Sequence, residues 1–279
     1  MNNEFIITVT SDGRYFDKLL VFLKSLYTTN SIDTLVTLVN VDKHKQEKIK
    51  KISNKIKINL IEKNIPNRVI GLKNDNNWQW VGLKNIKENN FTYTELSAFC
   101  NNIRFENILK CLELDYKYVI NMDIDQIFIN NVKFGNFFNK HDFYCFNESK
   151  NFKSFKNRNL KDLKPENTWV PESWLDKLTV IDQPLTDESF ICVKNNNKIK
   201  KFFKEADTLI KKDFLNWDAD FYILNNLYKK YKDVISFDTI YTEFNDRWFF
   251  DRDSFIWNGA AEIKTNNKKY INEYEKFAC

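Results

Sequence analysis

Two aspartates one residue apart, Asp123 and Asp125, are the side chains best placed for chemistry in this 279-residue chain. They directly follow an apolar run, residues 118–122, which predicts a buried strand of an α/β sheet. Ligands of such sheets gather beyond the carboxyl ends of the strands. Carboxylates two positions apart on an extended chain lean to the same side and can converge on one divalent cation. The sequence therefore predicts a metal site here, and a turn or helix cap is the alternative interpretation.

The composition predicts a folded chain with a large core. Hydrophobic residues make up 43% of the sequence and aromatic residues 16%, which excludes a disordered chain. The 5 Gly and 4 Pro are too few for a collagen-like or linker-rich protein. The net charge of +5 is small and spread along the sequence, so it does not indicate a nucleic-acid surface. The basic run over residues 43–57 is expected to be a solvated face.

Cysteine and histidine usage narrows the chemistry further. The five cysteines are widely spaced and form no Cys-x-x-Cys, so we expect thiols in a reducing compartment and no zinc site. The only histidines, His44 and His141, lie in polar surroundings and offer no basis for a histidine-based triad. No apolar run approaches the roughly 18 residues that a membrane-spanning helix needs. The start of the chain does not resemble a signal peptide. We expect a soluble, cytoplasmic protein.

Strands and helices alternate in the first part of the chain. Hydrophobic periodicity predicts strands over residues 5–10, 35–41 and 56–61 and helices over residues 15–28 and 43–53. This β-α-β-α-β order is the nucleotide-binding type of unit. It contains no Gly-x-Gly-x-x-Gly and no Walker loop, so neither NAD nor P-loop chemistry is supported.

A long helix is expected after a polar, irregular stretch at residues 63–91. Thr92 and Glu95 have the spacing of a capping box, and apolar residues then recur as far as Leu112. Arg104 lies on this helix, close to the strand that ends in Asp123. A simple surface cation is the alternative interpretation of Arg104.

The second part of the chain is expected to complete the same domain. Strands are predicted over residues 143–146, 189–193 and 234–237, and helices over 199–210 and 217–231. The intervening residues 147–182 are predicted to be a long loop, either a lid or binding loop or a disordered segment. We expect a single domain over residues 1–279, with a nucleotide-binding half (1–131) and an acceptor and sugar half (132–279).

The order and spacing of these pieces resemble those of GT-A-fold nucleotide-sugar glycosyltransferases, most closely the glycogenin and bacterial galactosyltransferase group (family 8). Asp123-Ile124-Asp125 resembles the metal-binding Asp-x-Asp of that family, which holds Mn²⁺ against the diphosphate of a UDP-sugar. The resemblance implies a GT-A (Rossmann-like) mixed sheet flanked by helices and Mn²⁺ (or Mg²⁺) as cofactor. It also implies sugar transfer, with retention, from a UDP-sugar to a hydroxyl acceptor on a glycan, a protein or a modified nucleic acid.

Other motifs extend the resemblance to donor binding. Residues 10–15 are similar to the first-strand motif of the family, which implies that Thr10, Asp12 and Tyr15 bind the donor. In that family the aspartate contacts the uracil and the aromatic ring packs against the base. Arg104 falls where the family has a helix arginine that contacts the sugar-nucleotide and the metal site.

Three acidic residues are catalytic candidates by the same resemblance. Residues 220–225 resemble the family's Asp-Gln-x-x-Leu-Asn, which implies that Asp220 lies beside the transferred sugar, although Phe221 replaces the glutamine. Asp187 and Glu188 fall where the family has a strand that contacts sugar and acceptor. Asp220 and Glu188 could each instead be an ordinary surface carboxylate.

The tail departs from the family pattern. The family's His-x-x-Gly-x-x-Lys corresponds here to Asn258-x-x-Ala261-x-x-Lys264. The resemblance implies that Lys264 binds the diphosphate and that Asn258 stands in place of a metal-ligating histidine. An amide oxygen is a weaker and harder ligand than an imidazole nitrogen. Asn258 is alternatively a turn-capping residue that never reaches the metal.

Two other functions remain open from the sequence. An apolar strand followed by Asp-x-Asp also resembles the haloacid-dehalogenase phosphatases, although in those enzymes the motif lies near the chain start. The replacement of the tail histidine by Asn258 also suggests a non-catalytic module that binds sugar-nucleotide or glycan without transferring it.

Overall fold

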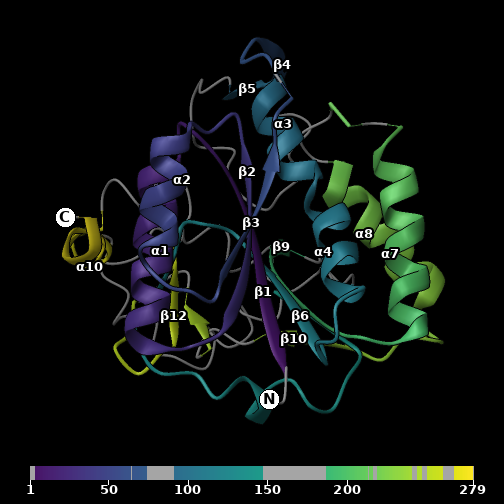
Figure 1. Cartoon of the computed structure of the whole chain (residues 1–279). Helices are drawn as coiled ribbons and strands as arrows, with labels where there is room; N and C mark the ends of the chain where they lie inside the picture. Colours follow the sequence, from purple (N-terminus) through teal and green to yellow (C-terminus); the bar gives the residue numbers. More distant parts are fainter. Residues whose placement is uncertain are drawn as a thin grey trace, which may run out of the picture.

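Within the described part of the chain, seven strands form one mixed sheet in the order β10-β8-β9-β6-β1-β2-β3. The computed structural model describes residues 4–63, 65–73, 91–146, 187–212, 214–215, 219–240, 244–246, 250–259 and 267–278. Helices α1 and α2 flank the sheet on one side, and α4, α7 and α8 on the other (Figure 1). Strands from both predicted halves share this sheet, as a single α/β domain requires.

The amino-terminal half alternates strands and helices as the sequence predicts. Its elements are β1 (Phe5–Asp12), α1 (Phe16–Thr29), β2 (Asp33–Val39), α2 (Lys43–Lys50) and β3 (Ile56–Ile61). The three strands pair in parallel, so their carboxyl ends lie at the same edge of the sheet. Asp42 caps α2 by accepting a hydrogen bond from Lys45 N at 2.9 Å.

The predicted long helix is in fact two helices, α3 (Glu95–Asn102) and α4 (Arg104–Leu112). The predicted capping box at Thr92 and Glu95 is wrong. Thr92 belongs to β5 (Phe91–Thr94), which pairs antiparallel with β4 (Val69–Lys73), two strands that the sequence did not indicate. The N-cap is Thr94, whose Oγ1 accepts from Ser97 N at 3.2 Å while Ser97 Oγ accepts from Thr94 N at 2.8 Å.

The second half adds strands on the other side of β1. The elements are β6 (Tyr118–Met122), β8 (Phe143–Phe146), β9 (Asp187–Lys194), α7 (Asn197–Ile210), α8 (Ala219–Tyr231) and β10 (Phe237–Ile240). Strand β6 pairs in parallel with β1 and antiparallel with β9. The predicted strand at residues 234–237 is misplaced, because Val234 and Ile235 form the turn that ends α8. The predicted loop at residues 147–182 lies outside the described residues.

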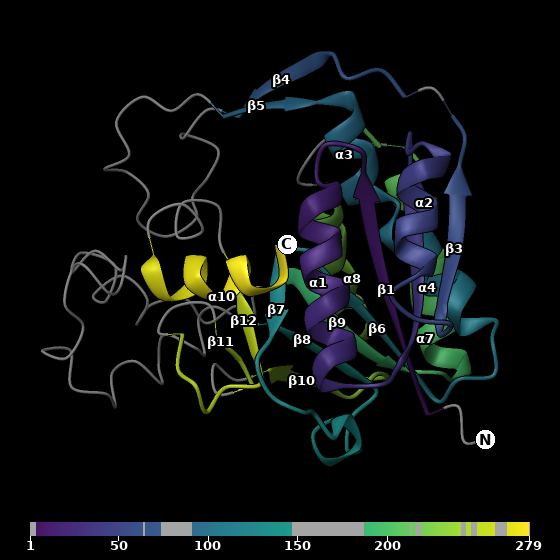
Figure 2. The same ribbon diagram turned by 60° about the vertical axis from the view of Figure 1, so that its left-hand side comes forward.

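A small second sheet joins the tail of the chain to the Asp-x-Asp segment. It contains β7 (Gln126–Phe128), β11 (Asn245–Asp246) and β12 (Ile256–Asn258). Strand β12 runs antiparallel to β7, and Asn258 lies opposite Gln126. Helix α10 (Lys268–Ala278), which the sequence did not predict, follows and ends near α1, where Lys24 Nζ donates to Phe277 O at 3.1 Å (Figure 2).

Two buried apolar clusters hold the layers together, because side chains of a strand alternate between the two faces of the sheet. One cluster joins α1 to the face that carries Ile7, Val9 and Ile120. The other joins α4, α7 and α8 to the face that carries Ile6 and Val119. Full burial of each large apolar side chain stabilises the fold by roughly 1.5–3 kcal/mol. The two clusters therefore hold the strand ends that carry the candidate site in fixed positions.

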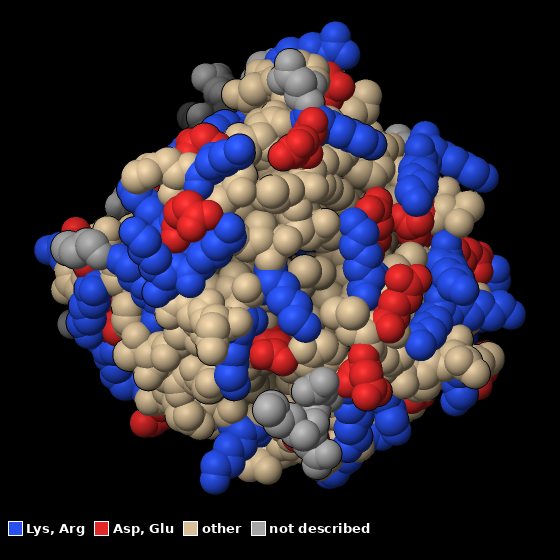
Figure 3. Space-filling view, viewed as in Figure 1, with Lys and Arg blue, Asp and Glu red and all other residues tan. Residues whose placement is uncertain are grey.

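The charged side chains on the surface are dispersed, as the small net charge of the sequence suggests. Acidic side chains lie among the basic ones on the face shown in Figure 3. No helix among the described segments is both long and apolar enough to cross a membrane. Cys100, Cys111 and Cys192 are thiols, as the sequence predicts.

Candidate active site

Asp123 and Asp125 lie in the turn between β6 and β7, directly beyond the carboxyl end of a strand in which every residue is buried. Asp123 N donates to Ser189 O of β9 at 3.0 Å, which ties the start of this turn to the neighbouring strand. The Asp123 side chain is 39% exposed, so its carboxylate can meet a ligand. Because β6 and β1 are parallel, Asp12 at the end of β1 lies at the same edge of the sheet. This confirms the predicted placement of the Asp-x-Asp segment.

Arg104 joins this turn to helix α8. Its guanidinium is 7% exposed, with Nε 3.0 Å from Asp220 Oδ2 and Nη2 3.6 Å from Asp123 Oδ1. Asn101 supports the pair, because its Nδ2 donates to Asp220 Oδ2 at 3.0 Å and its backbone oxygen accepts from Arg104 Nε at 2.8 Å. Arg104 is therefore a buried cation beside the Asp-x-Asp turn. The interpretation of this residue as a surface cation is wrong.

The structure places Asp220 in the interior, with a fully buried side chain. Its carboxylate is bound to Arg104 and Asn101. A charge buried this deeply is maintained by such partners. The interpretation of Asp220 as a surface acid is therefore wrong, and its contacts are those of a residue that positions Arg104.

The predicted donor-binding residues Thr10, Asp12 and Tyr15 lie at or just after the end of β1 and differ in their contacts and exposure. Thr10 Oγ1 accepts from Asn107 Nδ2 at 3.0 Å, and Asn107 Oδ1 accepts from Thr37 Oγ1 at 2.9 Å. Asp12 is 1% exposed, whereas Tyr15 is 43% exposed. Of the three, Tyr15 presents its side chain to solvent at the carboxyl edge of the sheet. An exposed aromatic ring at this edge is available to pack against a base.

Both carboxylate oxygens of Asp12 are held by Arg14. Arg14 Nη2 donates to Asp12 Oδ2 at 2.6 Å, and Nε lies 3.1 Å from Oδ1. This hydrogen bonding raises the pKa of the Arg14 guanidinium above its ordinary value, against the opposing effect of burial. Arg14 Nη1 also donates to Asn67 and Thr94, so it links β1 to the start of α3. Contact between Asp12 and a base therefore requires sharing or moving Arg14.

The tail of the chain lies beside the Asp-x-Asp turn through Asn258 in β12. The Asn258 side chain is 2% exposed, and its Nδ2 donates to Ser189 Oγ at 3.2 Å. Gln126 Nε2 donates to Ser189 O at 2.6 Å, so β7, β9 and β12 meet at Ser189. Asn258 therefore lies beside the Asp-x-Asp turn, and its amide nitrogen is directed at Ser189.

The backbone carbonyl of Asp125 accepts two hydrogen bonds. Gly259 N donates to it at 3.1 Å and Tyr270 Oη at 2.7 Å. Tyr270 is 3% exposed, and burial, with a smaller effect of Asp125, raises the pKa of its phenol above the ordinary value. The phenol therefore stays protonated and remains a donor at neutral pH.

The donor set at this turn fits a hard divalent cation. Carboxylate and amide oxygens are the ligands that Mg²⁺ and Mn²⁺ prefer, and such ions often take one or two carboxylates together with substrate phosphates. Among the described residues, no three His, Cys, Asp or Glu side chains are grouped so that they could hold a metal. Asp123 and Asp125 would thus hold an ion together with an amide oxygen and oxygens of the substrate.

Three predicted site residues cannot be placed by their side chains. Asp187 and Glu188 begin β9, so their backbone leads to Ser189 and the Asp-x-Asp turn, but their side chains lie outside the described residues. Lys264 also lies outside the described residues.

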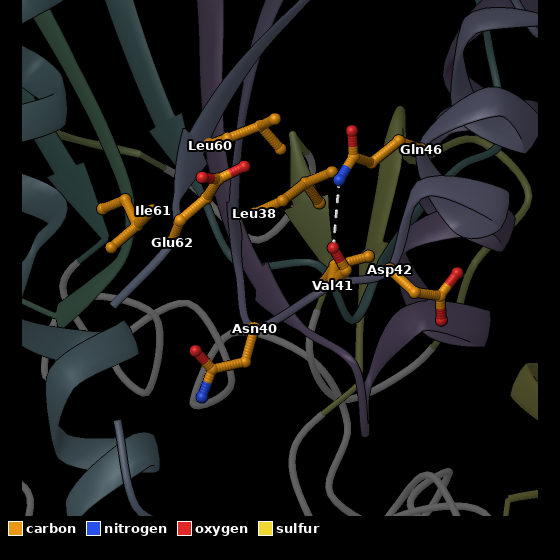
Figure 4. A pocket seen from close by; sticks show the side chains of 8 residues that line it. All are labelled: Leu38, Asn40, Val41, Asp42, Gln46, Leu60, Ile61 and Glu62. Atoms are coloured by element: carbon orange, nitrogen blue, oxygen red, sulfur yellow. Dashed lines mark hydrogen bonds between the residues drawn. The ribbon is translucent and has the colours of Figure 1, made fainter. Parts of the chain in front are cut away.

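A separate small pocket of about 190 Å³ lies beyond the ends of β2 and β3 (Figure 4). Leu38 and Leu60 contribute apolar walls, and Gln46 Nε2 closes one side by donating to Val41 O at 3.0 Å. The pocket is smaller than the roughly 300 Å³ at which ligand pockets begin. It contains none of the predicted site residues.

The sequence did not predict several residues that contribute to the site. Asn101, Asn107 and Tyr270 belong to none of the motifs described above, and Arg14 lies within the motif of residues 10–15 but was given no role there. A signal existed for Tyr270, because Tyr270, Tyr274 and Phe277 have the spacing of one helix face. Arg14 and Asn101 carried no such signal, because each also contacts a residue far away in sequence, Thr94 for Arg14 and Asp220 for Asn101.

The fold is that of known glycosyltransferases. It is similar to the galactosyltransferase LgtC, solved in complex with donor and acceptor sugar analogues, with a TM-score of 0.52, 14% identity and coverage of 98% of this chain and 95% of LgtC. It is also similar to the apo bifunctional glycosyltransferase WbbM, with a TM-score of 0.56, 11% identity and coverage of 100% of this chain but only 50% of WbbM. No protein-family model matches the sequence, and no curated protein matches it either. The chain thus has the GT-A glycosyltransferase fold that the sequence predicts.

Proposed function

We propose that this protein is a metal-dependent glycosyltransferase that moves a sugar, with retention, from a UDP-sugar to a hydroxyl acceptor. One observation carries the proposal. The Asp-x-Asp turn lies at the carboxyl end of a central strand of a GT-A sheet, and the buried Arg104 lies 3.6 Å from Asp123. The fold also favours this proposal over the phosphatase alternative, because LgtC and WbbM, which share the fold, are glycosyltransferases.

The leaving UDP develops negative charge on its diphosphate, and the site would stabilise that charge. Asp123 and Asp125 would hold Mn²⁺ (or Mg²⁺), which as a Lewis acid neutralises phosphate oxygens when bound. Arg104 provides a preorganised positive charge at the same turn. Lys264 is the second candidate for a positive charge that stabilises the leaving diphosphate. Tyr15 would pack against the uracil, with Thr10 and Asp12 beside it.

The roles of the three acidic candidates follow from their positions in the fold. Asp220 would orient Arg104 rather than touch the sugar, because its side chain is fully buried. Asp187 and Glu188 begin the strand whose Ser189 O accepts from Asp123 N, and by the family resemblance they remain the candidates for contact with the sugar and acceptor. In a retaining transfer the leaving phosphate itself can take the proton of the acceptor, so no histidine base is needed. The acceptor would be a hydroxyl of a glycan, a protein or a modified nucleic acid.

The test is donor binding followed by turnover. Melting temperatures are measured with UDP-, GDP- and CMP-sugars, each with Mn²⁺ and with EDTA. A UDP-sugar should raise the melting temperature by mass action, and EDTA should abolish the rise. Asp125→Asn should lower metal-dependent UDP release by roughly 10²–10³-fold, because the charge on the leaving group loses its support. The matched control is Asp115→Asn, at an exposed position before β6, which should leave both measurements unchanged.

A second candidate function is binding without transfer. It is favoured by the engagement of Asp12 with Arg14, which occupies a carboxylate that a donor would use. Asn258 also stands where the resembled family has a metal-ligating histidine. This alternative would be established if the protein bound a UDP-sugar in a metal-dependent way but released no UDP from it, whichever hydroxyl acceptor was present. UDP binding that is equally tight in EDTA and in Asp123→Ala would contradict the metal site in both functions.

A further inference from the structure

Helix α10 lies outside the sheet but touches the Asp-x-Asp turn directly. Tyr270 Oη donates to the backbone carbonyl of Asp125 at 2.7 Å, across a large separation in sequence. The ring of Tyr270 packs beside that of Phe250 in a tilted arrangement, with centroids 5.5 Å apart. The residue is 3% exposed, so this contact belongs to the interior and not to a mobile surface.

The helix itself is fixed at both ends and in the middle. Asn267 Oδ1 accepts from Lys269 N at 2.9 Å at its start, and Lys24 Nζ donates to Phe277 O at 3.1 Å at its end. Glu273, in the middle, lies 2.6 Å from Arg252 Nη2. The tyrosine hydroxyl is therefore presented to Asp125 by a helix that is capped at its start and held to two other parts of the fold, at Lys24 and at Arg252.

We propose that Tyr270 is a positioning residue for the candidate metal site, because its hydroxyl fixes the Asp125 peptide group and so the direction of the Asp125 carboxylate. The inference rests on the proposed function, in which Asp125 holds a divalent cation. The carbonyl oxygen takes hydrogen bonds from Tyr270 and from Gly259, so its peptide plane is held from two directions. A carboxylate on a fixed backbone loses less freedom when it binds an ion.

The experiment measures metal affinity, not only activity. Mn²⁺ is titrated into wild type and Tyr270→Phe, each with saturating UDP, and the unbound Mn²⁺ is followed by electron paramagnetic resonance. Phe keeps the packed ring and removes one hydrogen bond, so the Mn²⁺ dissociation constant should rise roughly 2- to 10-fold. The KM for Mn²⁺ in turnover should rise by the same factor, while kcat at saturating Mn²⁺ changes less.

The matched control is Tyr274→Phe, one turn further along α10, where the ring stacks on Tyr270 with centroids 6.4 Å apart. This variant should keep the wild-type Mn²⁺ affinity. A double-mutant cycle adds a second test, because Tyr270→Phe should weaken Mn²⁺ binding no further in an Asp125→Asn background.

The outcomes separate the inference from the function on which it rests. If wild type binds Mn²⁺ with UDP and Tyr270→Phe binds it equally well, Tyr270 is only structural and the inference is overturned. Equal weakening by Tyr274→Phe would overturn it too, because the effect would then belong to the helix as a whole. If wild type binds no divalent cation at all, the proposed metal site and this inference both fail.

Discussion

Arg104 and Asp220 form a buried ion pair, in which the arginine Nε lies 3.0 Å from the aspartate Oδ2. The pair connects helix α4 to helix α8, and the other side of the guanidinium is directed at Asp123. Two motifs that are far apart in sequence therefore share one cation. The Arg104–Asp220 contact therefore affects both the stability of the site and the position of the positive charge beside the Asp-x-Asp turn.

Asp220→Asn should destabilise the protein strongly. Removing one partner of a buried ion pair leaves an uncompensated charge, at a cost of roughly 3–5 kcal/mol in the free energy of unfolding. The matched control is Glu106→Gln on α4, which breaks an exposed pair with Lys110 at 2.9 Å and should cost less than about 0.5 kcal/mol. Urea unfolding of both variants measures the difference. Equal costs would show that the Arg104–Asp220 pair contributes no more than a surface pair.

Thr94→Ala should shorten or loosen helix α3. Thr94 is the N-cap, and loss of a threonine cap costs roughly 1 kcal/mol. Thr92→Ala removes the threonine that sequence spacing suggested as the cap, and it should leave α3 capped. Hydrogen exchange at Ser97 N distinguishes the two variants, because this amide loses its acceptor only in Thr94→Ala. Faster exchange in Thr92→Ala than in Thr94→Ala would contradict the observed cap.

Glu273 should make the stability of the protein sensitive to acid. Burial alone raises the pKa of Glu273, but hydrogen bonds from Arg252 and Lys276 outweigh it and hold the pKa below its ordinary value. A carboxylate whose pKa is lower in the folded state contributes stability above its unfolded pKa, roughly 4.3, and loses it as the pH falls through the folded value. The free energy of unfolding should therefore fall more steeply below about pH 4.3 in wild type than in Glu273→Gln.

The partner control for this prediction is Arg252→Gln. It removes a contact of 2.6 Å to Glu273 and should reduce the acid-dependent part of the stability in the same direction. Chemical unfolding at a series of pH values provides the measurement. If the free energy of unfolding changed with pH in the same way in wild type and Glu273→Gln, Glu273 would not contribute to the acid sensitivity.

Replacement of Asn258 should change metal preference if its amide oxygen reaches the ion. An imidazole favours softer transition metals, so Asn258→His should tighten Mn²⁺ and widen its advantage over Mg²⁺, whereas wild type should accept Mg²⁺ with little loss. Affinity without UDP should be poor in wild type. Calorimetric titration of both ions, with saturating UDP, compares wild type with Asn258→His and Asn258→Ala. Identical affinities in the three proteins would exclude Asn258 from the metal site.

Ser189→Ala provides a separate control for the Asn258 variants. Asn258 Nδ2 donates to Ser189 Oγ at 3.2 Å, so substitutions at position 258 also remove this hydrogen bond. Ser189→Ala removes it without altering a proposed ligand. Its metal affinity therefore shows how much of any change arises from the lost contact alone.

Local pattern was sufficient for most of the strands and helices. The strands at residues 56–61 and 143–146 were predicted with the bounds that the structure has, and the apolar run before Asp123 is the buried β6. Alternation of apolar residues and turn residues reports burial within a few positions of sequence. Such patterns therefore determined the order of the elements, the α/β class and the strand end that carries the Asp-x-Asp.

Contacts between distant segments were decided only by the tertiary structure. Periodicity did not show that Arg104 would be buried against Asp220, that Arg14 would reach Thr94, or that Tyr270 would hold Asp125. Each contact joins a side chain, whose local sequence is compatible with exposure, to a partner far away in sequence, and each forms because the packing of other elements brings the partners together. A buried charge or hydroxyl costs free energy unless such a partner is present. The sequence by itself determined which groups could do chemistry, and the tertiary packing determined which of them share one site.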